Sequence, residues 1–380
     1  MNGGRYPSVD IGIPRESLAR EHRVALTPSG VRALVERGQR VYLETGAGAE
    51  AGHSDGDYQS AGATVAYARD EVFHRADLLL GVYAPRPPEY ALLRPGQTVL
   101  AFWNLPASHG ESLRALADRK VTAIGLEAIE DDDGRAPALM AMSEIAGALA
   151  VIVGAGLLLN EYGGKGVLLT GAPGVPPAQL VILGAGVLGQ AAARAAVGLG
   201  AEVLLLDVST AKLREAVDRL PRPVPTMVST PHNIERALAF ADLVIAAPAV
   251  RGDRAPVIVT RAMLQRMKPR SVVMDFAIDM GGCLETSRPT YFPHPCYEVE
   301  GVLHFCVPNL PAIVARSATL ALTNTVLPWV VDLAEQGTEA ALAHDPALRR
   351  GTYLYEGQCV KESLAQLFGL PYQPPPAWGR

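Results

Sequence analysis

The chain has 380 residues, which at roughly 150 residues per domain predicts two or three domains. Apolar residues make up 49% and charged residues 19%, a balance that excludes an intrinsically disordered chain. The 39 acidic and 34 basic residues give a net charge of −5 without any conspicuous lysine or arginine run. Nucleic acid and anionic membranes are therefore not expected partners.

No segment has the pattern of a signal peptide or a membrane span. Residues 1–10 are polar, and the longest apolar run, 145–159, has about 15 residues where a bilayer requires roughly 20. We interpret that run as a buried helix. The four cysteines form no C-x-x-C pair and the histidines complete no zinc pattern, so we expect free thiols and no metal. These features predict a soluble, cytoplasmic protein of enzyme size.

Short apolar runs alternate with helical patterns in the first third of the chain. Alternation of strands and helices is typical of βαβ units, so we expect a parallel sheet. The expected strands are 41–43, 78–82, 98–102 and 121–126, and the expected helices are 29–37 and 112–119.

A second series of the same kind begins near residue 180. A long helical pattern, 311–335, follows it, and Pro328 is expected to kink this helix. The proline-rich end, 370–380, is expected to be extended. The expected strands of the second series are 180–183, 203–206, 243–246 and 272–274, and its helices are 187–198, 210–219 and 234–240.

A glycine-rich turn follows the first strand of this second series. Gly184, Gly186 and Gly189 form G-x-G-x-x-G between a strand and a helix, as a dinucleotide pyrophosphate requires. Asp207 ends the next strand 18 residues after Gly189, where a carboxylate binds the adenosine ribose. Because a carboxylate repels a 2′-phosphate, the pattern favours NAD over NADP. A second G-x-G at 154–156 lies inside the apolar run, and we assign it to helix packing.

Several further segments, distributed along most of the chain, match a known family together with this turn. Together they resemble the alanine dehydrogenase family, which includes the nucleotide-binding part of proton-translocating transhydrogenase. The segment at 321–324 resembles alanine dehydrogenase more closely than transhydrogenase. The segments that carry the resemblance are 13–16, 21–28, 44–48, 142–147, 275–282 and 307–311.

The resemblance implies an α/β fold with two doubly wound, Rossmann-like domains and a cleft between them. It implies a discontinuous substrate domain at 1–137 plus 316–380 and an NAD-binding domain at 138–315. It also implies a homo-oligomer built from dimers, often a hexamer. Chain pattern alone predicts one boundary near residue 140 and does not predict the return of the C-terminal segment.

The same resemblance implies roles for individual residues. Ser143, Lys212, Ser229, Asp279 and Asn309 are expected around the cofactor, and Asp279 is also expected in the catalytic site together with Arg23. Without the resemblance, the first three of these are typical of helix caps or of the protein surface.

Arg23 and Asp279 each have a structural alternative. Arg23 is expected to bind a substrate carboxylate through paired hydrogen bonds, or else to form an ion pair with an acid such as Glu16. Asp279 follows a strand at the edge where ligands bind in such sheets, or else it caps the turn at Gly281 and Gly282.

Two positions depart from the family pattern. Tyr83 stands where alanine dehydrogenases carry a lysine that helps to bind the substrate, and Asn104 stands where they carry a histidine that moves protons. Asparagine does not titrate, and tyrosine, with a reference pKa near 10, is a poor base at neutral pH. His22 and His109 are alternative proton carriers, although each is also typical of a surface histidine.

These features support three hypotheses. The first is an NAD(H)-dependent oxidoreductase acting on an amino acid, or its imine or keto acid, other than plain alanine and mainly in the reductive direction. The second is a ketone or alkene reductase with Tyr83 as proton donor. The third is a nucleotide-binding protein without chemistry of its own. In the first, the partner is a small molecule with a carboxylate.

Overall fold

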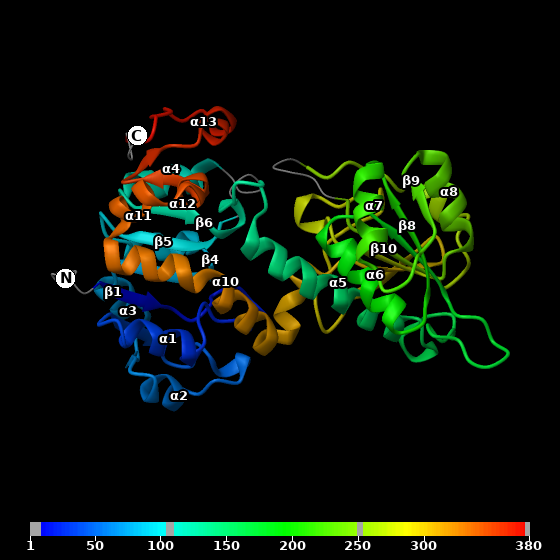
Figure 1. The fold of residues 1–380 in the computed structure, drawn as a ribbon, viewed down its shortest axis with the longest axis horizontal. Helices are drawn as coiled ribbons and strands as arrows, with labels where there is room; N and C mark the ends of the chain where they lie inside the picture. Colours follow the sequence, from blue (N-terminus) through cyan, green and yellow to red (C-terminus); the bar gives the residue numbers. More distant parts are fainter. Residues whose placement is uncertain (1–8, 104–109, 249–253, 377–380) are drawn as a thin grey trace. The chain divides into compact units, whose positions relative to one another are not determined.

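The computed structural model describes residues 9–103, 110–248 and 254–376. Its contacts divide the chain into two compact units, Met1–Met142 with Ala312–Arg380, and Ser143–Pro311. Each unit is a layered α/β structure built on a mostly parallel sheet (Figure 1). The expected two-domain, Rossmann-like α/β architecture is therefore confirmed.

The first unit contains an eight-stranded sheet in the order β15-β14-β6-β5-β4-β1-β2-β3. Strands β1 to β6 are parallel, as expected for the first third of the chain, whereas β14 and β15 come from the C-terminal segment and pair antiparallel. The strands are β1 (Asp10–Ile13), β2 (Arg40–Glu44), β3 (Thr64–Ala66), β4 (Leu78–Tyr83), β5 (Thr98–Phe102), β6 (Thr122–Gly125), β14 (Thr352–Tyr355) and β15 (Gln358–Cys359).

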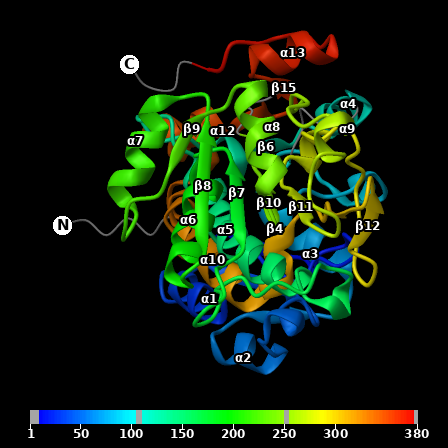
Figure 2. The same cartoon turned by 90° about the vertical axis from the view of Figure 1, so that its right-hand side faces the viewer.

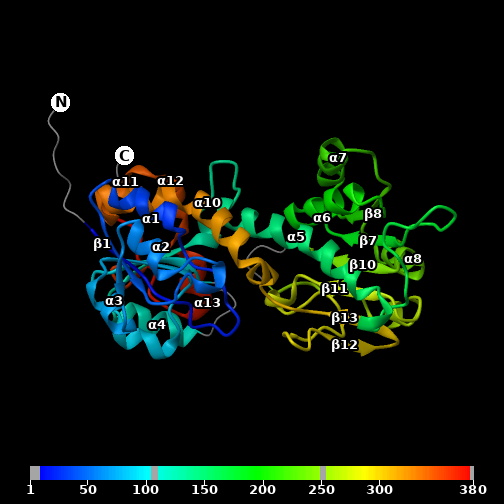
Figure 3. The ribbon, with the colours of Figure 1, turned by 90° about the horizontal axis from the view of Figure 1, so that it is seen from below.

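Helices cover both faces of this sheet, with α1, α11 and α12 on one side and α3 and α4 on the other (Figure 3). Phe73, Leu113 and Leu116 from α3 and α4 pack with Tyr353 of β14 in one buried core. The helices are α1 (Pro28–Val35), α2 (Asp55–Ser60), α3 (Arg69–Arg75), α4 (Gly110–Asp118), α10 (Ala315–Gln336), α11 (Thr338–His344), α12 (Pro346–Gly351) and α13 (Glu362–Phe368).

The second unit contains a seven-stranded sheet in the order β12-β13-β11-β10-β7-β8-β9. Figure 2 shows five of its strands side by side, in the order β9, β8, β7, β10 and β11. Only β12 pairs antiparallel within the described part of this sheet. The strands are β7 (Gln179–Leu183), β8 (Glu202–Asp207), β9 (Thr226–Val228), β10 (Leu243–Ala246), β11 (Val272–Asp275), β12 (Cys296–Val299) and β13 (Val302–Phe305). The helices are α5 (Pro137–Leu157), which begins in the first unit, α6 (Val187–Gly198), α7 (Thr210–Arg219), α8 (Pro231–Phe240) and α9 (Arg261–Leu264).

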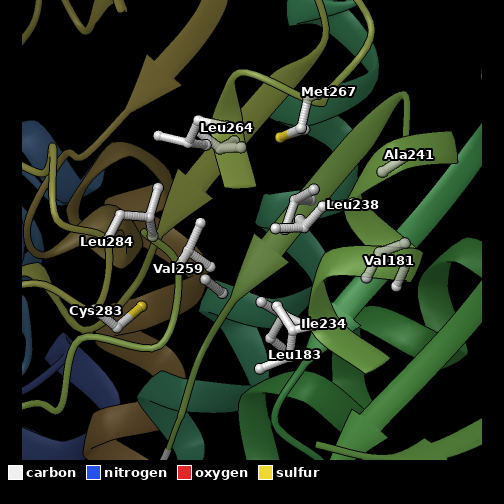
Figure 4. Close-up of a cluster of buried hydrophobic side chains, with 14 of the residues drawn as sticks. Val181, Leu183, Ile234, Leu238, Ala241, Val259, Leu264, Met267, Cys283 and Leu284 are labelled. Carbon is white, nitrogen blue, oxygen red and sulfur yellow. The ribbon is translucent and has the colours of Figure 1, made fainter. Parts of the chain in front are cut away.

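A single apolar core lies under α8 and α9 on one face of this sheet (Figure 4). Ile234 and Leu238 from α8 pack with Leu264 from α9 and with Val181 and Leu183 from β7. The central strands are buried on both faces, which is why they are almost continuously apolar in the sequence.

The apolar run near residue 150 lies in α5, which is 21 residues long rather than about 15. A Cβ at Gly154 would lie 2.6 Å from the side chain of Leu243 in β10, so the assignment of this glycine to helix packing is confirmed. Both Pro137–Leu157 and Leu310–Gln336 are long and apolar enough to cross a membrane. Of the most apolar 18-residue stretch in each, 44% and 50% respectively is buried within the protein. Partly buried core helices of soluble proteins satisfy the same length and composition.

The expected start of the long C-terminal helix needs correction. The long C-terminal helix begins at Ala315, because Leu310–Val314 forms a 3₁₀ turn, and the helix continues through Pro328. Of the proline-rich end, residues 370–376 contain a single bridge between Cys359 and Tyr372, and the rest lies outside the described residues.

Candidate active site

The glycine-rich turn between β7 and α6 forms the first part of the candidate site. Gly184 adopts φ +113°, and a Cβ there would overlap the carbonyl oxygen of Ala247. A Cβ at Gly189 would overlap the carbonyl oxygen of Gly184, so this close packing requires glycine at both positions. Gly186 is the N-cap of α6 and carries no side chain to cover the first N–H groups of the helix. Such N–H groups are donors for an anion.

Asp207 lies at this turn, at the end of β8, and is 8% exposed. Its Oδ2 accepts a hydrogen bond from the N–H of Ala185 at 2.7 Å, and its Oδ1 accepts one from the N–H of Ser209 at 2.8 Å. The N–H of Ser229 donates to the carbonyl oxygen of Asp207 at 3.0 Å. Each carboxylate oxygen has a second lone-pair direction, so the same group can also bind ribose hydroxyls. These residues fit a dinucleotide.

The other expected cofactor residues lie on three different elements. Lys212 is exposed on the first turn of α7, and Ser143 is half-buried in α5. Asn309 has a positive φ of 54°, and its N–H donates to the carboxylate of Asp279. Asp279 is exposed in the 3₁₀ turn Ile278–Met280, so the structure brings Asn309 and Asp279 into contact.

The neighbouring glycine turn is closed by the backbone. The N–H of Gly281 donates to Ile278 and that of Gly282 donates to Ala277, at 3.0 and 2.9 Å. Both glycines have positive φ, which explains the residue type at these two positions. Capping of this turn by Asp279 is therefore not the arrangement observed.

Asp275 organises the same loop and was not singled out by sequence reasoning. It ends β11, is 2% exposed, and accepts hydrogen bonds from the N–H groups of Ala277 and Cys283 at 2.8 Å. The hydroxyl of Ser287 donates to it as well. An acid directly after an apolar strand is the signal that could have identified it.

In the first unit, Arg23 is 3% exposed and forms a buried ion pair with Glu21. Its Nε donates to Glu21 Oε1 at 2.7 Å and its Nη2 donates to Oε2 at 2.8 Å. Nη1 lies 3.1 Å from Met142 Sδ. Among the described residues, the acid that pairs with Arg23 is therefore Glu21 and not Glu16.

Tyr83 is the half-buried last residue of β4, and the centre of its ring lies 5.7 Å from the guanidinium carbon of Arg23. The loop after β1 approaches the same strand end through Glu16, which accepts hydrogen bonds from the N–H groups of Val82 and Tyr83. The ends of β1 and β4 thus bring Glu16, Arg23 and Tyr83 into one cluster. Sequence reasoning considered Glu16 only as a partner of Arg23.

Two cavities adjoin this cluster within the first unit. One, of about 200 Å³, is lined by Tyr83, Phe102 and Trp103, and the other, of about 420 Å³, is lined by His22 and Arg23. Their common wall consists of Arg15, Glu16, Ser17, Leu18 and Arg69. The carboxyl ends of parallel strands are where ligands bind in such sheets, and the cavities lie at the ends of β1, β4 and β5.

Of the two histidines considered, His22 has a side chain that is 38% exposed, and its Nδ1 lies 3.4 Å from Glu50 Oε2. His109 and Asn104 lie outside the described residues. Trp103, which precedes Asn104, is held by two contacts from its main-chain N–H to the carboxylate of Glu127, at 3.1 and 3.2 Å.

The sequence matches two family models over most of its length. Residues 12–146 match the alanine dehydrogenase/PNT N-terminal domain, and residues 150–362 match the corresponding C-terminal domain. An alanine dehydrogenase of Halomonas elongata is 45% identical over 363 residues, which cover 95% of this chain and 97% of that protein. An alanine dehydrogenase of Mycobacterium tuberculosis is 43% identical over 365 residues, covering 96% and 98%.

A solved structure of an L-alanine dehydrogenase superposes with a TM-score of 0.90 at 42% identity, covering 95% of this chain and 99% of that one. The family models match most of both units in sequence, and the solved structure covers 95% of this chain. The chain therefore belongs to the alanine dehydrogenase/PNT family, and it is an oxidoreductase whose cofactor is NAD(H).

Proposed function

We propose that the protein interconverts an amino acid and its imine or 2-keto acid, using NAD(H), with a substrate other than plain alanine. The observation that carries this proposal is the combination of the Asp207 turn in one unit with the Arg23 cluster and its cavities in the other. The first supports binding of a dinucleotide, and the second supports binding of a small carboxylate.

The chain's own residues divide between cofactor and substrate. When bound, NAD(H) supplies or accepts the hydride. Asp207 receives the adenosine ribose hydroxyls and disfavours a 2′-phosphate, and the turn supplies N–H donors to the pyrophosphate. The proposed cofactor residues are Ser143, Gly184, Gly186, Gly189, Asp207, Lys212, Ser229 and Asn309.

On the substrate side, Arg23 binds the carboxylate through its Nη1–Nη2 end, and Tyr83 donates a hydrogen bond or a proton. The side-chain amide of Asn104 orients the substrate, and Asp279 is the proposed catalytic residue of the second unit. Tyr83 and Asn104 support a substrate other than plain alanine. Alanine dehydrogenases carry a lysine and a histidine at these positions, and neither Tyr83 nor Asn104 supplies the positive charge of that lysine or the titrating imidazole of that histidine. They also favour reduction, since a preformed iminium needs less help from a base.

We further propose a substrate domain at 1–137 plus 316–380, an NAD-binding domain at 138–315, and a cytoplasmic homo-oligomer built from dimers. Resemblance to the family supports these points.

Consumption of NADH over a panel of 2-keto acids, with and without ammonia, tests the proposal. Amino-acid chemistry requires ammonia, so we expect turnover only when ammonia is present. Turnover without ammonia would indicate a ketone or alkene reductase with Tyr83 as proton donor. Binding of NADH without any turnover would indicate a nucleotide-binding protein without chemistry.

A further inference from the structure

The carboxyl group of Glu16 is held in an unusual way against the end of β4. The N–H of Val82 donates to Oε1 at 2.6 Å, and the N–H of Tyr83 donates to Oε2 at 3.2 Å. Successive N–H groups of a regular strand point to opposite sides, so they cannot both reach one carboxyl group. Strand β4 departs from this pattern, because its register with β5 shifts between Leu80 and Tyr83.

Gly81 makes this irregularity possible. A Cβ at Gly81 would overlap the carbonyl oxygen of Tyr83 and would lie 3.6 Å from Glu16 Oε1. Any larger residue would therefore force Val82 and Tyr83 away from their present course. The glycine and the bulge together form a niche of N–H donors for one carboxyl group.

Several charged side chains around Glu16 form ion pairs with other residues. Glu21 pairs with Arg23, and Arg69 pairs with Glu44 and Glu89. Over the described ranges, no cationic side chain donates a hydrogen bond to Glu16.

Burial therefore has the largest effect on the ionisation of Glu16 and raises its pKa to about 8. The two N–H groups and the charge of Arg23 oppose this rise, whereas the charge of Glu21 adds to it.

We propose that Glu16 is the acid–base residue of this enzyme, in a chain where Tyr83 and Asn104 occupy the family's lysine and histidine positions. The inference rests on the proposed amino-acid oxidoreductase function. Glu16 lines both cavities at the strand ends, and its carboxyl group is oriented by fixed backbone donors rather than neutralised by an ion pair.

In the oxidative direction, the neutral amine form of the substrate would become an iminium ion, with bound NAD⁺ as the acceptor of its hydride. Water then attacks the iminium carbon, the C=N π electrons move to nitrogen, and Glu16 accepts a proton from the water. The protonated carboxyl group returns that proton to the nitrogen as the C–N bond breaks. The oxygen lone pair completes the carbonyl group, and the hydroxyl proton passes to solvent. Reduction follows the same steps in reverse.

Other acids and bases near the cavities are less suited to this role. His22 contacts Glu50, and its side chain is 38% exposed. Glu21 and Glu89 are held in ion pairs with Arg23 and Arg69.

The pH dependence of kcat/KM, measured with the best substrate of the panel, tests the inference. Oxidation requires the carboxylate, so its kcat/KM should rise through about pH 8, and reduction requires the acid, so its kcat/KM should fall through the same range. In Glu16→Gln this limb of the pH profile, the change in kcat/KM near pH 8, should disappear. The kcat of this variant should fall about 10²- to 10³-fold, and its KM should stay within about threefold of the wild-type value. Glu16→Asp, which still titrates, should retain the limb at intermediate kcat.

Glu36→Gln is the matched control, because it removes an exposed carboxylate at the end of α1 in the same unit, and Glu36 lines neither cavity. It should retain the limb and change kcat by no more than about twofold. A limb that persists in Glu16→Gln, or that disappears in His22→Asn, would overturn the inference.

Infrared difference spectroscopy without substrate gives a second readout. Between about pH 6 and pH 10 the wild type should lose the stretch of a protonated carboxyl group, and Glu16→Gln should lack that change. If the carboxyl group of Glu16 titrated with the ordinary pKa of a glutamate, the inference would be overturned even if the enzyme were active. Absence of turnover with every keto acid would instead contradict the proposed function, so the two failures are distinguishable.

Discussion

Asp207 combines a structural and a binding role at the scale of one residue. Its carboxylate holds the N–H groups of Ala185 and Ser209, which fixes the glycine-rich turn beside the start of α7. We propose that the same negative charge disfavours the 2′-phosphate of NADP(H). Stability and cofactor choice are therefore coupled at this position.

Asp207→Asn should narrow the preference for NADH over NADPH by about tenfold, or about 1.4 kcal/mol, because it removes the charge and keeps one hydrogen-bond acceptor. Titration calorimetry with both cofactors measures the ratio. Asp218→Asn, which removes an exposed charge on α7, is the control and should change neither affinity by more than about twofold. Equal binding of both cofactors by the unmodified protein would contradict the placement of Asp207.

Tyr83 and Asn104 account for the expected weakness toward alanine. Tyr83→Lys combined with Asn104→His should raise alanine oxidation at neutral pH, whereas Asn104→His alone should have little effect if both groups are needed. Tyr83→Phe should slow the native reaction, since it removes only the hydroxyl. Steady-state rates of NADH formation measure each case. An unmodified enzyme that already oxidises alanine at about 10 turnovers per second would refute this interpretation.

At the scale of elements, the β7–turn–α6 unit shows how local sequence encodes a site. Apolar residues end at Leu183, the turn needs glycine for steric reasons, and the helix follows from Val187. These are local properties, so the motif was predictable. Asp275 was missed although its partners are local, whereas the role of Glu16 depends on backbone N–H groups 66 and 67 residues away in the sequence.

Strand β1 shows a different limit of prediction. It lies between β2 and β4 in the sheet, yet it has four residues and contains Gly12. Glycine is typical of turns, but here a Cβ would lie 2.7 Å from Ala76, so close packing explains the residue. Strand β14 pairs with β6 from more than 200 residues away, and β15 pairs with β14, which no local pattern reveals.

Gly189→Ala should destabilise the protein and weaken NADH binding strongly, because its Cβ would overlap the carbonyl oxygen of Gly184. Gly198→Ala, in the same helix, is the matched control, since no described heavy atom lies within 4 Å of a Cβ built there. It should leave NADH affinity unchanged and stabilise the helix by up to about 1 kcal/mol. Thermal unfolding and NADH fluorescence distinguish the two. Equal effects of both substitutions would show that the turn is not tightly packed.

At the scale of the whole molecule, the two units differ in how the chain builds them. The second is one continuous segment with its own sheet and core, whereas the first needs residues 312–380 to supply β14, β15 and four helices. The residues of the described core cluster of the second unit all lie within that unit. The unit has about 170 residues, a size at which domains commonly fold alone.

A fragment of residues 137–311, which keeps α5 whole, should fold alone and bind NADH, whereas a fragment of residues 1–142 should not fold. Circular dichroism and amide dispersion in NMR spectra measure folding, and fluorescence titration measures NADH binding. A folded 1–142 fragment would show that the C-terminal return is dispensable.

The central claim is that hydride passes between NAD(H) and the α-carbon of an amino acid. Mass spectrometry of the product formed from NADH deuterated at C4, ammonia and the best 2-keto acid tests it most directly. The account predicts one deuterium at the α-carbon of an amino acid, transferred from one face of the nicotinamide only. Deuterium found in a 2-hydroxy acid, or in no product at all, would contradict it.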